Sequence, residues 1–295
     1  MYKHILVSID GSKPSNHALT KAIDLAKHYN SALLISHVID ARSFPTMAGP
    51  HHGELQSQYN KTAEELLEKS KKEAEDAGLE QVQTILWNGN PRFEIPDKMT
   101  KEYNIDLLIV GESGRNAAER MIIGSVTEAC IRRSPCDVLT VKNKTSTTLY
   151  RRILVAVDGS KQAEKALAKA IELASIHQAK LTIAHISEWG TFAKDIAFYQ
   201  HSYVAEVQKE SEDMLKKYKE QAENQGLKDV QTILRSGNPR LEIPRVLTVE
   251  NSCDLLITAE TGQHAVSRFF TGSVAESSVR RSSCDVITVK KEQMA

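Results

Sequence analysis

The chain repeats itself after an interval of 148 residues. The tripeptide Asp-Gly-Ser at 10–12 returns at 158–160, and residues 105–142 share 21 identities over 38 positions with residues 253–290, without a gap. Solenoid repeats are only about 20–50 residues long, so a period of this length indicates duplication of a whole domain. We therefore expect two similar domains, residues 1–142 and 151–291, joined by a polar linker at 143–150.

Within each half, short apolar runs alternate with helical patterns. In the first half the strand-like runs are 4–10, 31–40, 82–87, 106–110 and 136–142, and the helical segments are 17–29, 55–78 and 125–133, with a further helix starting at Asn90-Pro91. Residues 41–54 contain two prolines and two glycines and are expected to form a loop, acting as a lid. Alternating strands and helices predict an α/β fold with a parallel sheet and right-handed crossovers.

Charge and composition exclude several classes of protein. The 38 basic and 38 acidic residues cancel, which argues against a nucleic-acid binder. No apolar run approaches the roughly 20 residues of a membrane span, and the first ten residues read as a strand and not as a signal peptide. The four cysteines form no C-x-x-C pair, so neither a disulfide framework nor a zinc ribbon is indicated. A reducing cytoplasm is the expected location.

A glycine-rich segment follows the fourth predicted strand in each half. In the first half it contains Gly111, Gly114 and Gly124 and then opens a helix. Free main-chain N–H groups and a helix N-terminus attract anions, so this arrangement suits a phosphate. Ligands of parallel sheets bind beyond the carboxyl ends of the strands, where Asp10, Val38 and Gly111 are expected to converge. The P-loop pattern is absent, and the third strand ends in neither half with the aspartate that a phosphoreceiver domain needs.

These residues and their spacing resemble the ATP-binding class of universal stress proteins, and the resemblance covers nearly the whole chain twice. It implies two tandem Rossmann-like (adenine nucleotide alpha hydrolase-like) domains, each a five-stranded parallel sheet in the order 3-2-1-4-5 with helices on both faces. The implied nucleotide-binding residues of the first domain are Asp10, Val38, Gly111, Gly114, Arg115, Gly124, Ser125 and Val126. Asp10 and the backbone around Val38 would hold the adenine and ribose, Gly111 would let the backbone approach the ribose, and the others would surround the phosphates.

The second domain keeps most of this pattern with two departures. Its implied, weaker site consists of Asp158, Ile186, Gly262, Gly272, Ser273 and Val274. Ala259 replaces Gly111, and Gln263 replaces Arg115, which removes one positive charge from beside the expected phosphates. A direct contact from that arginine would contribute about 1–3 kcal/mol. The sequence therefore predicts that nucleotide is held mainly in the first domain.

The expected function is that of an adenine-nucleotide-binding stress-response regulator. ATP is the expected ligand, with AMP or ADP and an accompanying magnesium ion left open. The alternatives are a scaffold or small-ligand-binding stress protein without ATP turnover, and a slow ATPase, since the sequence shows no catalytic base or metal-ligand set. No nucleic acid or membrane partner is expected. The two fifth strands are expected to pair as an internal pseudo-dimer, and a homodimer of the tandem chain is a further expectation.

Several singled-out residues have simpler interpretations. The glycines could serve only a tight turn, and Asp10 could be the N-cap of the following helix. His37 and His185 occupy equivalent strand positions and are expected to be core residues and not ligands. His51-His52 has no spaced ligand nearby, which argues against a metal site.

Overall fold

The computed structural model describes residues 1–40, 52–112, 123–142, 149–188, 201–260 and 273–291. The chain divides into two compact units, Met1–Thr148 with Glu292–Ala295, and Leu149–Lys291. Each unit is an α/β domain, which confirms the expectation of two tandem domains. The boundaries at residues 142 and 151 and the pairing of the two fifth strands stay predictions.

The two units have the same order of elements. The first contains β1 (His4–Ser8), α1 (Lys13–Tyr29), β2 (Ala32–Ile39), α2 (His52–Asp76), β3 (Val82–Asn88), α3 (Pro91–Phe93), η2 (Glu94–Met99), α4 (Thr100–Glu102), β4 (Leu107–Gly111), α5 (Ser125–Arg133) and β5 (Asp137–Val141). The second contains β6 (Arg152–Ala156), α6 (Lys161–His177), β7 (Lys180–Ser187), α8 (His201–Asn224), β8 (Val230–Ser236), α9 (Pro239–Leu241), η4 (Glu242–Leu247), α10 (Thr248–Glu250), β9 (Leu255–Ala259), α11 (Ser273–Arg281) and β10 (Asp285–Val289).

The strands of each unit are parallel and follow the predicted order. In the first unit the order is β3-β2-β1-β4-β5, and in the second it is β8-β7-β6-β9-β10. The register pairs Ser8 of β1 with Ser36 of β2 and Val7 of β1 with Ile109 of β4. β1 therefore lies between β2 and β4, at the point where the chain reverses its direction across the sheet. This is the position at which open α/β sheets bind ligands.

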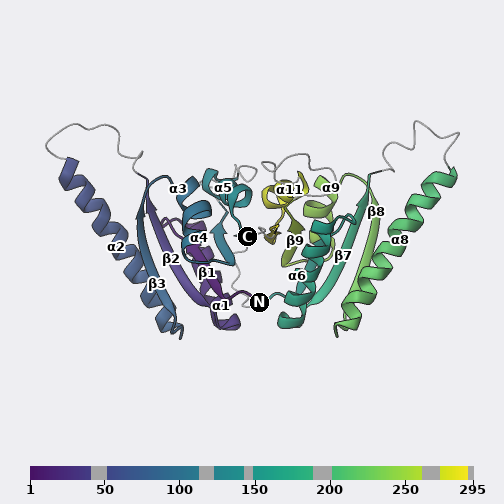
Figure 1. Cartoon of the computed structure of the whole chain (residues 1–295), viewed down its shortest axis with the longest axis horizontal. Coiled ribbons are helices and arrows are strands. Elements are labelled where there is room, and N and C mark those ends of the chain that lie inside the picture. Colours follow the sequence, from purple (N-terminus) through teal and green to yellow (C-terminus); the bar gives the residue numbers. More distant parts are fainter. Residues whose placement is uncertain (41–51, 113–122, 143–148, 189–200, 261–272, 292–295) are drawn as a thin grey trace. The chain divides into compact units, whose positions relative to one another are not determined.

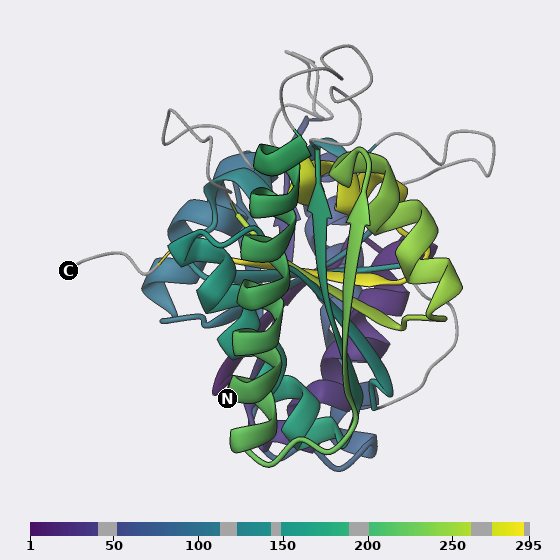
Figure 2. The same ribbon diagram turned by 90° about the vertical axis from the view of Figure 1, so that its right-hand side faces the viewer.

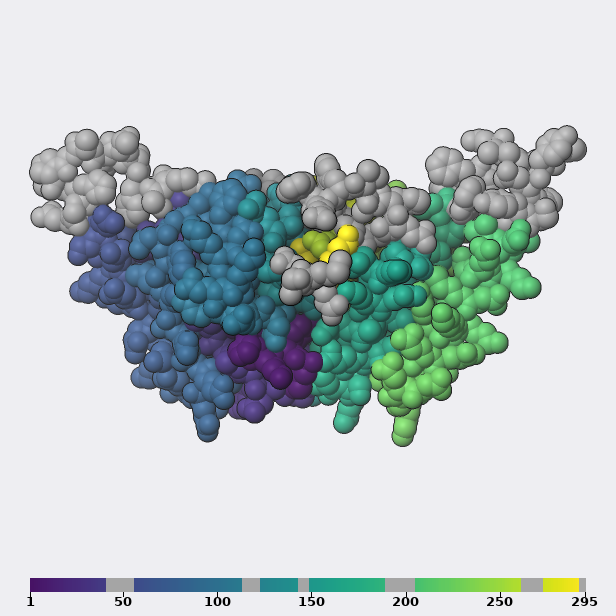
Figure 3. Space-filling view, viewed as in Figure 1, coloured from purple at the N-terminus to yellow at the C-terminus, as the bar shows by residue number. Residues whose placement is uncertain are grey.

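Helices cover both faces of the sheet. In the first unit α2 runs alongside β3, and α3 to α5 lie on the other side of the strands (Figure 1). The surface of α2 is visible at the left of the first unit in the space-filling view (Figure 3). Figure 2 shows the counterpart α8 beside the strands of the second unit. Helix α1 buries the face predicted from its periodicity, which consists of Ala18, Ala22, Leu25 and Ala26.

The predicted long helix begins earlier than expected. α2 starts at His52, so the last three residues of the loop predicted at 41–54 are helical, and the rest of that loop lies outside the described residues. After the helix ends at Asp76, Gly78 has the left-handed φ of 91° that a helix C-terminus favours, and the Leu79 N–H donates to the Ala74 carbonyl at 3.1 Å. None of the described helices is both long and apolar enough to cross a membrane.

The connection from β3 to β4 begins as predicted and then changes its hydrogen-bond pattern. Asn90 is the N-cap, accepting from the Arg92 N–H at 3.1 Å, and Pro91 is the first helical residue. The following turns, Glu94–Met99, form a π-helix. This segment contains Pro96, whose missing N–H cannot join an α-helical ladder. The second unit repeats the pattern, with Pro244 inside η4.

Candidate functional site

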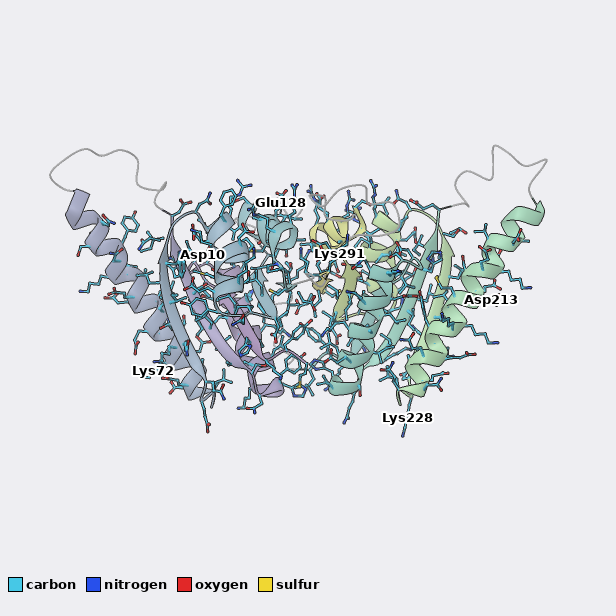
Figure 4. All side chains as sticks on the ribbon, viewed as in Figure 1. Asp10, Lys72, Glu128, Asp213, Lys228 and Lys291 are labelled. Carbon is cyan, nitrogen blue, oxygen red and sulfur yellow. The ribbon has the colours of Figure 1, made fainter. Side chains whose placement is uncertain are left out.

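The predicted ligand-binding residues of the first unit meet at one edge of the sheet. Asp10 follows β1, Val38 lies near the end of β2, and Gly111 ends β4, and these three strands are neighbours. In Figure 4, the labelled residues Asp10 and Glu128, the latter on α5, both lie at this edge. The convergence predicted from the strand pattern is therefore present in the structure. The second unit brings Asp158, Ile186 and Ala259 together on the corresponding strands.

Asp10 is held in a tight turn and does not cap the helix. One of its carboxylate oxygens accepts from the Ser12 N–H at 3.0 Å, while the N-cap of α1 is Ser12, whose hydroxyl oxygen accepts from the Ser15 N–H at 3.4 Å. The N-cap interpretation of Asp10 was therefore wrong, because the helix starts two residues later. Burial acts to raise the pKa of the Asp10 carboxyl, but hydrogen bonds from Ser12 and Ser15 and the nearby His37 outweigh it and lower the pKa.

Gly111 is enclosed by the first turn of α1. A Cβ at this position would lie 2.6 Å from the carbonyl carbon of Pro14 and 3.0 Å from the Ser15 nitrogen, both main-chain atoms. On the other side, the hydroxyl of Thr127 in α5 donates to the Gly111 carbonyl oxygen at 3.0 Å. The glycine therefore permits close packing of α1 on β4. Its predicted approach to a ribose stays a prediction.

The amino end of α5 has no side-chain cap within the described part of the chain. Gly124 is the N-cap, with no side-chain hydrogen bond to the first turn, and the helix begins at Ser125 and Val126. The first N–H groups of a helix have no partner within it, and together with the helix dipole they favour an anion. Four predicted phosphate-binding residues lie outside the described residues, namely Gly114, Arg115, Gly262 and Gly272.

The two strand histidines have a common and unexpected position. The Nδ1 atom of His37 lies 2.8 Å from the main-chain oxygen of Ile9, and the Nδ1 atom of His185 lies 2.8 Å from that of Val157. Both rings are only half-buried. They are therefore not the enclosed core residues that the sequence suggested. In the part of the chain that the structure describes, no cluster of three or more His, Cys, Asp or Glu side chains could hold a metal.

The second unit differs at several positions around the same edge. The turn is retained, since Asp158 accepts from the Ser160 N–H at 3.0 Å. Ala163 and Ala275 replace Ser15 and Thr127, so the hydroxyl contacts to Asp10 N–H and to the Gly111 carbonyl have no counterpart. These substitutions remove polar contacts that tie the turn and β4 to their neighbouring helices in the first unit.

A tyrosine and a glutamate are added near the turn of the second unit. Tyr218, on α8, is 3% exposed, and its hydroxyl donates to Glu164 in the first turn of α6 at 3.5 Å. Burial raises the pKa of the Tyr218 phenol, and the negative charges of Glu164 and Asp158 raise it further. The equivalent residues of the first unit are Ser70 and Asn16. The surroundings of Asp158 therefore carry one more negative charge, that of Glu164, than the surroundings of Asp10.

The sequence analysis did not predict a cluster formed by Trp87 near the end of β3 with Glu94 and Lys98 of η2. The Glu94 carboxylate is 8% exposed and accepts from the Trp87 indole at 2.8 Å and from Lys98 at 2.9 Å. In the second unit Arg235 takes the place of Trp87 and contacts Glu242 at 3.2 Å. The hydrogen bond from Lys98 lowers the pKa of Glu94, against the opposing effect of burial. The i,i+4 spacing of Glu94 and Lys98 was the available signal.

Replacing Glu94 with glutamine is expected to destabilise the first unit by about 1–3 kcal/mol at neutral pH, because Lys98 loses a buried ionic partner. A lowered folded-state pKa means that the carboxylate stabilises the fold above its usual value of 4.5, and that this contribution is lost as the pH falls through the folded-state value. Urea unfolding of wild type and Glu94→Gln should therefore differ at about pH 7 and converge as the pH falls through the lowered folded-state pKa of Glu94.

Glu242→Gln is the matched control for this measurement. The Glu242 side chain is 26% exposed, against 10% for Glu94, and Arg235 keeps a second carboxylate partner in Glu250 at 2.7 Å, so the expected loss is only about 0–1 kcal/mol. A stability difference between wild type and Glu94→Gln that persists unchanged in acid would contradict the assigned ionic contribution.

Comparisons with known proteins agree with the duplicated fold. The universal stress protein family matches residues 1–142 and again residues 149–290. A curated universal stress protein of Staphylococcus haemolyticus (strain JCSC1435) is 39% identical over 143 residues, which are 48% of this chain and 86% of that protein. The crystal structure of a universal stress protein from Archaeoglobus fulgidus DSM 4304 covers 98% of this chain and 96% of its own, at 24% identity and a TM-score of 0.74. A universal stress protein solved in complex with cAMP covers 48% of this chain and 98% of its own, at 25% identity and a TM-score of 0.37.

Proposed function

The chain belongs to the universal stress protein family, which matches both of its halves, and from this premise we propose that it is a regulatory protein that binds adenine nucleotide, with ATP held mainly in its first unit. AMP and ADP are the nearest alternative ligands, and a magnesium ion would accompany the phosphates of ATP. The nucleotide acts as a signal that shifts the population of conformations through its differential affinity for them. The proposed role is in the stress response of the cytoplasm.

The observation that carries the proposal is the meeting of three kinds of ligand-holding group at one edge of the first unit. Asp10 supplies a carboxylate whose lowered pKa keeps it an acceptor for hydroxyl groups. The main chain near Val38 supplies amide donors and acceptors for a base. The amino end of α5 at Ser125 supplies N–H groups for phosphates. ATP combines a base, hydroxyls and phosphates in one ligand, so this set suits it.

The differences in the second unit support a weaker site there. Glu164 adds a negative charge close to Asp158, where the first unit has the neutral Asn16. Gln263 lacks the positive charge of Arg115. Both changes disfavour a ligand with several negative charges, since like charges repel and a charge-assisted hydrogen bond is lost. The proposed affinities of the two units differ by about tenfold or more.

Native mass spectrometry and titration calorimetry on the purified chain test this proposal. We expect co-purified adenine nucleotide or one strong ATP site per chain, followed by a weaker one. If neither experiment detects nucleotide, the alternative of a scaffold or of a protein for another small ligand is supported. Two sites of equal affinity would contradict the assignment to the first unit.

Hydrolysis of ATP is expected to be slower than about 1 per second, the lower end of ordinary enzyme turnover. Asp10 is a weak base because its pKa is lowered, and general-base catalysis is most efficient when the pKa lies near the working pH. Phosphate release from ATP by the purified protein measures this. Asp10→Asn is the control, because a contaminating ATPase would be unaffected by it. Turnover above this limit that disappears in Asp10→Asn would show that the protein is an enzyme.

A further inference from the structure

Successive residues of β2 direct their main-chain N–H and C=O groups alternately toward β1 and toward β3. This alternation determines which neighbour the peptide groups of Val38 face. The Ala32 N–H bonds Lys3 of the β1 side, and the Ser36 carbonyl accepts from Ile9 at 2.8 Å. The Leu33 N–H and the Ile39 carbonyl bond the β3 side instead. Even-numbered residues of β2 therefore direct their N–H and C=O groups toward β1. By this alternation the N–H and C=O of Val38 also face the β1 side, beyond the last residue of β1.

The ladder between β1 and β2 stops one step before Val38. The register ends at Ser8 and Ser36, and the last main-chain bond between the two segments, among the described residues, runs from the Ile9 N–H to Ser36. In a continued parallel ladder the next bond would run from the Val38 N–H to the Ile9 carbonyl. That carbonyl is instead 2.8 Å from Nδ1 of His37. A carbonyl only accepts, so the His37 nitrogen is the donor.

The second unit shows the same arrangement. The Val157 N–H bonds the Ala184 carbonyl at 2.9 Å, and the Val157 carbonyl lies 2.8 Å from Nδ1 of His185. The register between β6 and β7 ends at Ala156 and Ala184. Ile186 therefore occupies the same position as Val38. The two units have diverged at neighbouring positions such as Ser15 and Ala163, yet both keep this contact at the same step of the ladder, which indicates a structural role.

We propose that His37 and His185 are positioning residues, which hold the Ile9 and Val157 carbonyls away from the next step of the ladder. The peptide groups of Val38 and Ile186, which have no ladder partner within the described part of the chain, are thereby left available to bind the edge of an adenine base. Adenine presents an amino donor beside a ring-nitrogen acceptor, and a peptide edge with one free C=O and one free N–H complements that pair. This inference rests on the proposed function for its ligand. It also implies that the second unit retains the base-binding half of the site.

Amide hydrogen exchange in the nucleotide-free protein tests the positioning role without any ligand. We expect the Val38 N–H to exchange about tenfold or more faster than the Ser36 N–H, and the Ile186 N–H to behave likewise. In His37→Leu the Ile9 carbonyl is no longer held by the imidazole and can turn toward β2, so the Val38 N–H should bond it and exchange more slowly. His37→Asn keeps a side-chain donor and should retain the fast exchange. Slow exchange at Val38 in the wild-type protein would overturn the proposal.

Titration with ATP and with inorganic triphosphate separates this role from a general effect on folding. His37→Leu is expected to weaken ATP binding about tenfold and to leave triphosphate binding unchanged, and His37→Asn to restore ATP binding. His185→Leu is the matched control and should leave the strong site intact. Equal loss of both ligands in His37→Leu would overturn the base-binding role. If the wild type binds neither ligand while Val38 exchanges fast, the proposed function fails and the positioning role stands.

Discussion

Valine at Gly124 is expected to lower the affinity for ATP by about tenfold or more, whereas valine at Gly272 in the second unit is expected to change it little. The Gly124 backbone has φ −61° and ψ 144°, which valine adopts readily, so the fold should tolerate the substitution. The branched side chain would instead obstruct the amino end of α5, where phosphates are proposed to bind. Titration calorimetry with ATP measures the effect.

The same pair of substitutions at Gly114 and Gly262 provides a second comparison. These glycines belong to the same predicted motif, so Gly114→Val should resemble Gly124→Val, and Gly262→Val should resemble Gly272→Val. Unfolding curves of the four variants provide the control for folding. Loss of ATP binding only through the second-unit variants would show that the strong site lies in the other half of the chain.

Alanine at Gly111 is expected to destabilise the first unit by about 1–3 kcal/mol, which is the usual effect of overpacking. The added methyl group would meet the Pro14 carbonyl group and the Ser15 nitrogen, which are main-chain atoms and cannot move away as a flexible side chain would. Urea unfolding, with the two units followed separately, measures the loss.

Ala259→Gly is the matched control for that measurement. It removes a methyl group from the equivalent strand position and should cost only about 0.4–1 kcal/mol, through the greater freedom of the unfolded chain. An equal effect of the two substitutions, or a neutral Gly111→Ala, would show that the contact with Pro14 does not limit the first unit.

The fold was predictable because each signal was local and repeated. The alternating runs identified the strands, and the duplication supplied every element twice. The boundary of α2 was less accurate, since the polar residues from His52 onward lack the periodicity that would mark a helix. The π-helix at Glu94–Met99 was not predicted, because it depends on how Pro96 interrupts a ladder and not on a pattern of apolar residues.

The candidate site was predictable in its location and less so in its contacts. The carboxyl ends of parallel strands determine where Asp10, Val38 and Gly111 meet. The role of Gly111 in packing could not be read from the sequence, because its neighbour Pro14 is distant along the chain. The contact of His37 with Ile9 was likewise hidden, since an alternating strand pattern predicts only which face a side chain occupies and not its hydrogen-bond partner.

The close contact between Gly111 and α1 also restricts how the two halves of the chain could have diverged after duplication. With the spacing seen between Pro14 and β4, a single Gly-to-Ala mutation would be strongly disfavoured in the first unit. The second unit carries Ala259, so its helix start and strand end cannot have that spacing. Each residue therefore fits only the helix position of its own unit, and exchanging only the glycine segments between the two halves should give misfitted hybrids unless the start of α1 or α6 is exchanged with them.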